Sequence, residues 1–172
     1  SSGTEEFVTR YLKSKKKKRR KRTMAMLGKE VRMSRLVNPK SNKMMAITVD
    51  HAISRGIAPM TGLHHIQDTI DKIILGKPDA MTMTKGIAEH CMWNHAGDVS
   101  MLMKISNYSP VAPTNDTVFG TVDEAIRMGA DAVSMGAMTL GDFQGEQFER
   151  IGKVAEECMA KGMPLIGHVY PK

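Results

Sequence analysis

Two corners of the sequence repeat one pattern, and this repeat constrains the fold more than any other feature. The stretches Gly76–Met83 (GKPDAMTM) and Gly129–Met135 (GADAVSM) both run from a glycine through Asp-Ala into a short apolar segment, and Gly162–Pro164 begins a looser third copy. Each glycine is predicted to end a helix in the left-handed conformation, after which the chain enters a strand. Repeated helix–turn–strand units predict a parallel sheet with helices on its faces, either an open doubly wound sheet or a (β/α)8 barrel.

Five apolar runs of strand length follow one another along the chain. These predicted strands are Met44–Val49, Ala80–Thr84, Met101–Ile105, Ala132–Met135 and Pro164–Val169. No Gly-x-Gly-x-x-Gly pattern follows the first of them, which weighs against a dinucleotide-binding fold and favours the barrel. Because a barrel of this type needs eight strands, we expect an α/β fold that forms the first five βα units of a (β/α)8 barrel.

The segments between these strands are predicted as helices, with one exception. Helical periodicity or capping signals mark Leu63–Ile74, Gly86–His90, Thr121–Gly129 and Phe143–Lys161. Thr121 and Glu124 have the spacing of a capping box. In the last helix, Phe148, Ile151, Ala155 and Cys158 are predicted to share one face. The exception is Ser106–Thr117, which is predicted as a polar loop.

The positive charge is concentrated at the N-terminus. The formal net charge of the chain is +7, but ten Lys or Arg and only two Glu lie within residues 1–22, so the remainder is close to neutral. Such a block of like charges is predicted to stay disordered. We therefore divide the chain into a basic disordered tail, residues 1–27, and a partial barrel domain, residues 28–172. The tail is either a solvated segment or an arm that binds nucleic acid.

The composition excludes several other classes of protein. The two cysteines, Cys91 and Cys158, form no disulfide framework, so a cytoplasmic location is predicted. No apolar run approaches the length that spans a bilayer. Histidines and Cys91 cluster loosely between residues 64 and 95, but their spacing matches no standard zinc pattern, and we predict no metal site.

Asp50 and His51 directly follow the first predicted strand. In barrels and doubly wound sheets, chemistry occurs at the carboxyl ends of the strands. An aspartate in this position can equally be a turn former or a helix cap. The position therefore marks Asp50 as a candidate functional residue and leaves its role open.

An ordered set of short motifs resembles one known family. These motifs are Met33–Lys40, Val49–His51, Thr61–Leu63, Lys85–Ile87, Glu124–Ser134, Met163–Ile166 and Tyr170-Pro171. Together they resemble the class I aldolases of the archaeal fructose-bisphosphate aldolase type. That family includes an aminodideoxyheptulosonate synthase and the thiolase that processes phosphorylated autoinducer-2. The resemblance covers about residues 28–172 and implies a (β/α)8 barrel that assembles into a homo-oligomer.

The resemblance also implies a chemistry and a set of site residues. Members of the family form a Schiff base between a lysine and a phosphorylated sugar ketone, without a cofactor. Asp50 matches an aspartate that orients substrate hydroxyls or assists proton transfer, and Tyr170 matches the proposed proton donor. His51 and Lys172 are implied to bind substrate, although relatives often have arginine where Lys172 stands. Ala52 departs from the glycine common in relatives.

The lysine that would form the Schiff base has no match in this sequence. In the family it lies on the sixth strand, and the phosphate-binding loops follow later. Lys85 and Lys104 fall near predicted strand ends but match no catalytic lysine. We therefore expect a truncated aldolase chain that is inactive alone. The alternatives are a non-catalytic half-barrel remnant or subunit, and a nucleic-acid-associated protein that acts through its basic arm.

Overall fold

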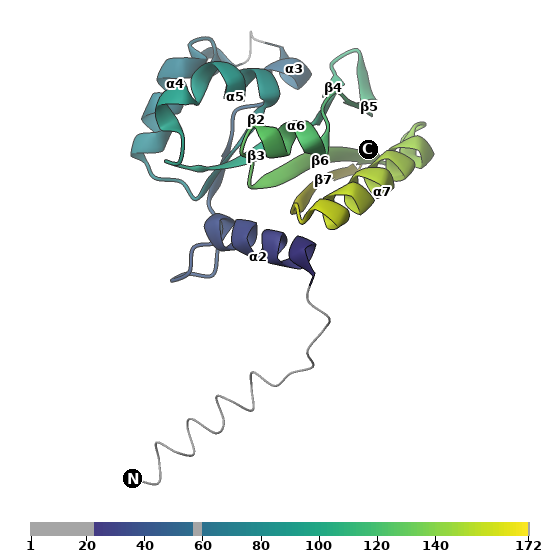
Figure 1. The fold of residues 1–172 in the computed structure, drawn as a ribbon. Coiled ribbons are helices and arrows are strands. Elements are labelled where there is room, and N and C mark those ends of the chain that lie inside the picture. Colours follow the sequence, from purple (N-terminus) through teal and green to yellow (C-terminus); the bar gives the residue numbers. More distant parts are fainter. Residues whose placement is uncertain (1–22, 57–59, 172) are drawn as a thin grey trace.

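A parallel sheet of five strands forms the centre of the molecule (Figure 1). The structure is a computed structural model that describes residues 23–56 and 60–171. The strand order is β1-β2-β3-β6-β7, and every neighbouring pair in it is parallel. The strands are β1 (Ala46–Thr48), β2 (Ala80–Thr84), β3 (Ser100–Lys104), β6 (Ala132–Thr139) and β7 (Leu165–Pro171). The predicted sequential half-barrel is thereby confirmed.

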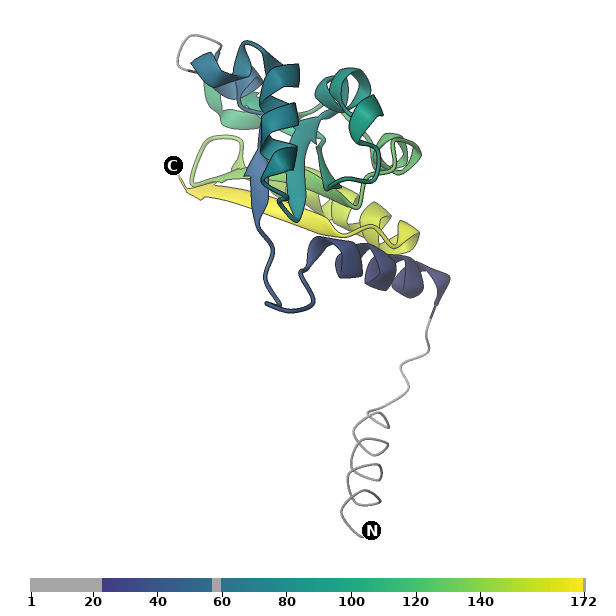
Figure 2. The same cartoon turned by 90° about the vertical axis from the view of Figure 1, so that its left-hand side faces the viewer.

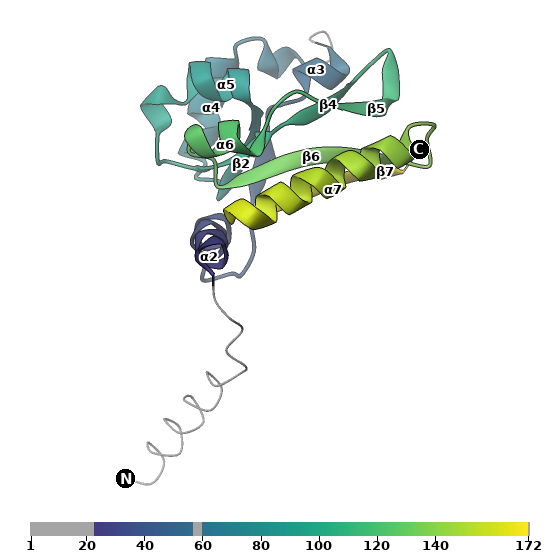
Figure 3. The same ribbon diagram turned by 45° about the vertical axis from the view of Figure 1, so that its right-hand side comes forward.

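Helices connect the strands and cover one face of the sheet (Figures 1 and 3). The longest, α7, lies along β6 in both views. The helices are α2 (Met24–Leu36), α3 (Ala52–Arg55), α4 (Ile66–Leu75), α5 (Lys85–Cys91), α6 (Val122–Arg127) and α7 (Gln144–Lys161), and the single 3-10 turns are η1 (Thr61–Leu63) and η2 (Trp93–His95). None of the helices within the described ranges is long and apolar enough to cross a membrane.

The two faces of the sheet differ in chemistry because side chains alternate along each strand. The outer face presents Met81, Met83, Met103, Val133 and Met135, which pack with buried residues of α4 to α7 in the main core. The inner face begins apolar, with Ala80, Leu102 and Ala132 packed against Leu36 of α2. Towards the carboxyl ends of the strands, this inner face becomes polar.

Helix α2 covers the end of the sheet where the strands begin (Figure 2). Its first residues also lie against Gly162, which ends α7 in the left-handed conformation with φ 64°. A side chain at Gly162 would place its Cβ 2.1 Å from the carbonyl oxygen of Ala25. Glycine is therefore required here both by the backbone conformation and by the close approach of α2.

The boundary of the predicted tail needs a correction. Residues 1–22, including the basic run, lie outside the described residues. Helix α2 begins at Met24, so residues 24–27 are helical rather than part of a disordered tail. The Oγ1 atom of Thr23 accepts a hydrogen bond from the backbone N–H of Met26, which caps the helix at this point.

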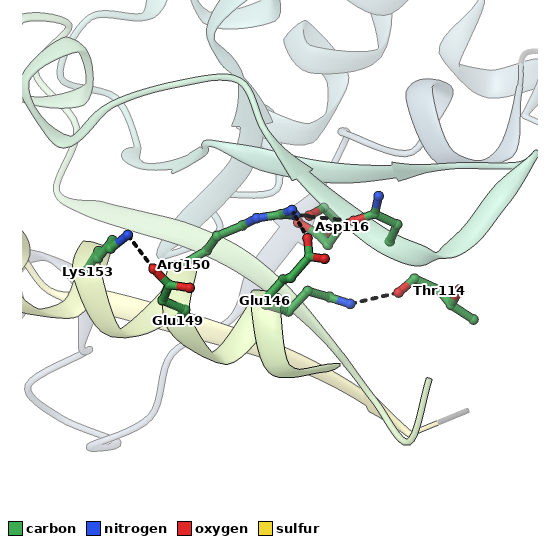
Figure 4. Close-up of polar contacts among 8 residues, drawn as sticks. Thr114, Asp116, Glu146, Glu149, Arg150 and Lys153 are labelled. Carbon is green, nitrogen blue, oxygen red and sulfur yellow. Dashed lines mark hydrogen bonds and ion pairs between the residues drawn. The ribbon is translucent and has the colours of Figure 1, made fainter. Parts of the chain in front are cut away.

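The predicted polar loop at Ser106–Thr117 is also wrong. The segment forms an antiparallel hairpin of β4 (Ser106–Ser109) and β5 (Ala112–Val118). Thr114, Thr117 and Val118 are β-branched and suit a strand, and contacts with α7 hold the hairpin in place (Figure 4). The Gln147 amide donates to the Thr114 carbonyl at 2.7 Å, and the Arg150 guanidinium donates to the Asp116 carbonyl at 3.0 Å.

Two further predictions, one about the end of a helix and one about the buried face of another, are only partly correct. Gly129 and Gly162 are left-handed as predicted, but Gly76 has φ −76° and Lys77 takes the left-handed position with φ 51°. The backbone N–H groups of both residues bond to carbonyls at the end of α4, so this helix closes one residue later. In α7, Phe148 is half exposed, whereas the neighbouring Gln147 is buried. The capping box of Thr121 and Glu124 is confirmed.

Candidate active site

The polar inner face is a continuous row of side chains across neighbouring strands. The strand register pairs Thr84 with Lys104, and Lys104 with Ser134. Extending the pairing of Thr48 with Thr82 by two residues places Asp50 level with Thr84. On the next strand, His168 is paired with Gly136 and Tyr170 with Met138. Asp50 and Tyr170 therefore lie at the carboxyl edge of the same sheet, as the sequence predicted.

Asp50 follows β1 and points into a largely enclosed position. Its side chain is 12% exposed, and its backbone carbonyl accepts a hydrogen bond of 3.3 Å from the Asn107 amide of the hairpin. The Nδ1 atom of His51 lies 3.9 Å from the Asp50 carboxylate. The side chain of His51 itself is 40% exposed.

Tyr170 lies between two other rings at the end of β7. Its ring makes an edge contact with Tyr108 of the hairpin and stacks on His168, both with ring centroids 6.5 Å apart. Burial raises the pKa of the Tyr170 phenol above its ordinary value, and the negative charge of Asp50 raises it further. The phenol is therefore protonated at neutral pH.

Lys104 is the most unusual charge on this face. The residue is only 3% exposed, and it makes no hydrogen bond or ion pair with any residue in the described ranges. Burial lowers the pKa of its ammonium group, while the charges of Asp116 and Asp50 act in the opposite direction. A buried lysine is uncommon unless its charge is used.

The hairpin brings a second carboxylate, Asp116, over the inner face. One of its oxygens occupies the space that a Cβ at Gly136 would need, at 2.1 Å, so the absence of a side chain there makes room for it. Asp116 is 2% exposed, and its Oδ1 atom has no hydrogen-bond partner in the described part of the chain. Burial raises the pKa of this carboxyl, and the Ser106 hydroxyl and the Lys104 charge oppose the rise.

His168 completes the cluster. Its Nε2 atom lies 2.8 Å from the Ser134 hydroxyl, and it stacks on Tyr170. Burial lowers the pKa of the imidazole, and the nearby Lys104 charge lowers it further, so His168 is neutral at pH 7. The sequence left open whether His168 was a satisfied core residue or lined the barrel mouth. It does both.

The remaining predicted site residues fall elsewhere. Lys172 lies outside the described residues. Lys85 forms an ion pair of 2.9 Å with Glu124 between α5 and α6, in the helical layer and away from the inner face. Asn107, Tyr108 and Asp116 were missed because their segment was predicted as a loop. Within residues 23–56 and 60–171, no three histidine, cysteine or acidic residues come together in a way that could hold a metal ion.

The described residues thus form the beginning of a (β/α) barrel, with polar side chains gathered at the carboxyl ends of its strands. A family model described as DeoC/LacD family aldolase matches residues 44–172. The chain belongs to the DeoC/LacD aldolase family, which agrees with the resemblance seen in its motifs.

Named relatives support the same assignment. The chain is 30% identical over 149 residues to 2-amino-3,7-dideoxy-D-threo-hept-6-ulosonate synthase 1 of Archaeoglobus fulgidus, covering 86% of this chain and 55% of the relative. It is 25% identical over 141 residues to the 3-hydroxy-5-phosphonooxypentane-2,4-dione thiolase of Photorhabdus laumondii, covering 81% and 47%. The chain thus spans about half the length of the curated relatives that it matches.

Solved structures show the same fold. An archaeal fructose 1,6-bisphosphate aldolase superposes with a TM-score of 0.71 at 20% identity, over 84% of this chain and 57% of the other. A Schiff-base-forming fructose-1,6-bisphosphate aldolase, studied through its reaction intermediates, superposes with a TM-score of 0.69. At this level of identity the likeness establishes the partial barrel and not the reaction.

Proposed function

We propose that this chain supplies the acid/base half of a class I aldolase site, which makes or breaks a carbon–carbon bond in a phosphorylated sugar ketone. The observation that supports it best is the placement of Asp50 and Tyr170 at one mouth, where the charge of Asp50 acts on the Tyr170 phenol. Family membership supports the reaction class. The proposal includes the extension of this reaction class from the relatives to this chain.

The roles follow from the chemistry of an iminium intermediate. When a lysine and a ketone have formed the iminium, the bond between the α and β carbons breaks as a group removes the proton from the β-hydroxyl, which leaves as an aldehyde while the electron pair forms an enamine. Asp50 would orient or deprotonate that hydroxyl, and Tyr170 would return a proton to the carbon that is left. His51 and Lys172 would bind the substrate. No cofactor is needed in this scheme.

The proposal includes inactivity of the 172-residue chain by itself. None of its lysines matches the family's Schiff-base lysine, and Lys85 is engaged by Glu124 in the helical layer. A cytoplasmic, homo-oligomeric protein is also proposed. The free thiols of Cys91 and Cys158 are both buried, and burial raises the pKa of Cys158 to about 11, which fits a protein of a reducing compartment.

Borohydride trapping tests this assignment. With fructose 1,6-bisphosphate, the 172-residue chain should yield no specific covalent adduct by mass spectrometry. If the source gene continues through three more βα units, the longer polypeptide should be trapped at a lysine on its sixth strand. In that longer polypeptide, Tyr170→Phe should suppress turnover and leave trapping largely intact, because it removes the proton donor and not the nucleophile.

Two results would contradict the proposal. A specific adduct at Lys104 of the 172-residue chain would identify Lys104, on β3, as the nucleophile. Equal turnover by the longer polypeptide with tyrosine or phenylalanine at position 170 would remove Tyr170 from the mechanism.

A further inference from the structure

Lys104 and Asp116 are two oppositely charged groups that are both enclosed and both incompletely paired. Lys104 is 3% exposed and Asp116 is 2% exposed. The Lys104 side chain has electrostatic interactions with Asp116 and Asp50 but no hydrogen bond or ion pair within the described ranges. Oδ1 of Asp116 is a buried oxygen that has no hydrogen-bond partner there. Buried polar groups are almost always hydrogen-bonded, and leaving them unpaired costs free energy. This arrangement indicates that something else completes the pair.

The two groups face the same space. Lys104 projects from the inner face of β3, next to Ser134 in the register. The Asp116 carboxylate lies over Gly136, two residues further along the same face of β6. Each charge acts on the other, because Lys104 lowers the pKa of Asp116 and Asp116 raises that of Lys104. Even so, no ion pair joins them, so each charge keeps hydrogen-bonding capacity for a polar group that lies within reach of both.

The chemistry of the pair selects the kind of group that fits. An ammonium only donates hydrogen bonds, and an ionised carboxylate only accepts them. A hydroxyl accepts from the first and donates to the second at the same time. A carbonyl oxygen cannot donate to Asp116, and a phosphate would be repelled by Asp116 and Asp50, which are both close enough to act on Lys104.

We propose that Lys104 and Asp116 form a hydroxyl-binding subsite at the mouth of the sheet, which takes one hydroxyl of a polyhydroxylated sugar phosphate. This inference deepens the proposed function and rests on it only for the sugar-phosphate nature of the ligand. The subsite contributes to specificity. A ligand that lacks the hydroxyl leaves both charges unpaired and should bind at least about tenfold more weakly.

The first experiment uses a ligand that cannot form a Schiff base. The chain is prepared with 13C-labelled lysine and titrated with glucitol 6-phosphate, a polyol phosphate without a carbonyl group. The Lys104 side-chain signal, assigned through its loss in Lys104→Met, should shift on titration. With n-hexyl phosphate, which carries the phosphate but no hydroxyls, it should not shift. Because no imine is involved, this result is independent of the trapping experiment.

Either of two other outcomes overturns the subsite. If both ligands shift the Lys104 signal equally, Lys104 binds phosphate. If neither shifts it, the gap holds an ordered water only.

Matched variants separate binding from folding. Lys104→Met and Asp116→Leu should each weaken glucitol 6-phosphate binding about tenfold or more, towards the affinity of n-hexyl phosphate. Lys153→Met is the control, since the Lys153 side chain is 74% exposed on α7. The double variant Lys104→Met/Asp116→Asn should keep a cooperative thermal transition at or above the wild-type temperature, because a buried charge is removed. If the double variant fails to fold, the pair is structural and the subsite is wrong.

Discussion

At the scale of the residue, Tyr170 connects the fold to the proposed chemistry. Its phenol is half exposed, and Asp50, Tyr108 and Asp116 all disfavour the phenolate, whereas Arg55 favours it. Its ring makes an edge contact with Tyr108 and stacks on His168. A protonated phenol is suited to donate a proton to a carbon atom of a bound substrate.

A spectroscopic titration tests this environment. The absorbance change at 295 nm, taken as the difference between wild type and Tyr170→Phe, should show Tyr170 ionising above the usual tyrosine pKa of about 10. Asp50→Asn should lower the Tyr170 pKa, because the charge that opposes the phenolate is gone. Asp68→Asn, at an exposed position on α4, is the control and should leave it unchanged. A Tyr170 pKa at or below the ordinary value would contradict this description of the mouth.

At the scale of the element, α7 holds together parts of the chain that are distant in the sequence. Its first turns bond to the β4–β5 hairpin through Gln147 and Arg150 (Figure 4). At its other end, the capping residue Gly162 contacts the start of α2 (Figure 3). The hairpin in turn brings Asn107, Tyr108 and Asp116 to the mouth. The position of these site residues therefore depends on a helix that contributes no residue to the site.

Two glycines associated with α7 should respond in opposite directions to the same substitution. Gly162→Ala forces a left-handed alanine, which costs about 1–2 kcal/mol, and it also brings the new Cβ against Ala25. Gly152 lies at an exposed position in the middle of α7, and a new Cβ there would have nothing within 4 Å. Gly152→Ala should therefore stabilise the folded state by about 0.5–1 kcal/mol. Urea unfolding measures both changes, and a shift in the same direction for both variants would contradict the described junction.

At the scale of the whole molecule, the five-stranded sheet ends in two outer strands, β1 and β7. Strand β7 presents Val169, which is 61% exposed, beside the half-exposed Tyr170. An open strand edge with apolar neighbours is a template for pairing with another chain. This feature agrees with the proposed homo-oligomer.

Light scattering coupled to size exclusion should therefore show self-association of the 172-residue chain at micromolar concentration. Val169→Lys should weaken that association, because it places a charge on the edge strand. Val111→Lys is the matched control, since Val111 is 93% exposed at the hairpin turn and lies away from β7. A stable monomer with a single cooperative unfolding transition would argue against edge pairing.

The amino-acid sequence by itself determined the order and direction of the five strands and the strand ends that carry Asp50 and Tyr170. These features were predictable because apolar runs, helical periodicity and the Gly-Asp-Ala corners act over a few residues. The capping box of Thr121 was visible for the same reason. The shared location of Asp50 and Tyr170 then followed from the rule that the carboxyl ends of parallel strands lie at one edge of the sheet.

Only the tertiary structure decided the rest of the site, because it depends on contacts between distant segments. The polar segment at Ser106–Thr117 forms a hairpin whose backbone accepts hydrogen bonds from Gln147 and Arg150 of α7. Gln147 is buried in place of Phe148 because its amide also accepts the Met138 N–H at 2.7 Å. The proximity of Asp116 to Lys104 required the missing side chain of Gly136 on a third strand, and no local pattern in the sequence encodes that meeting.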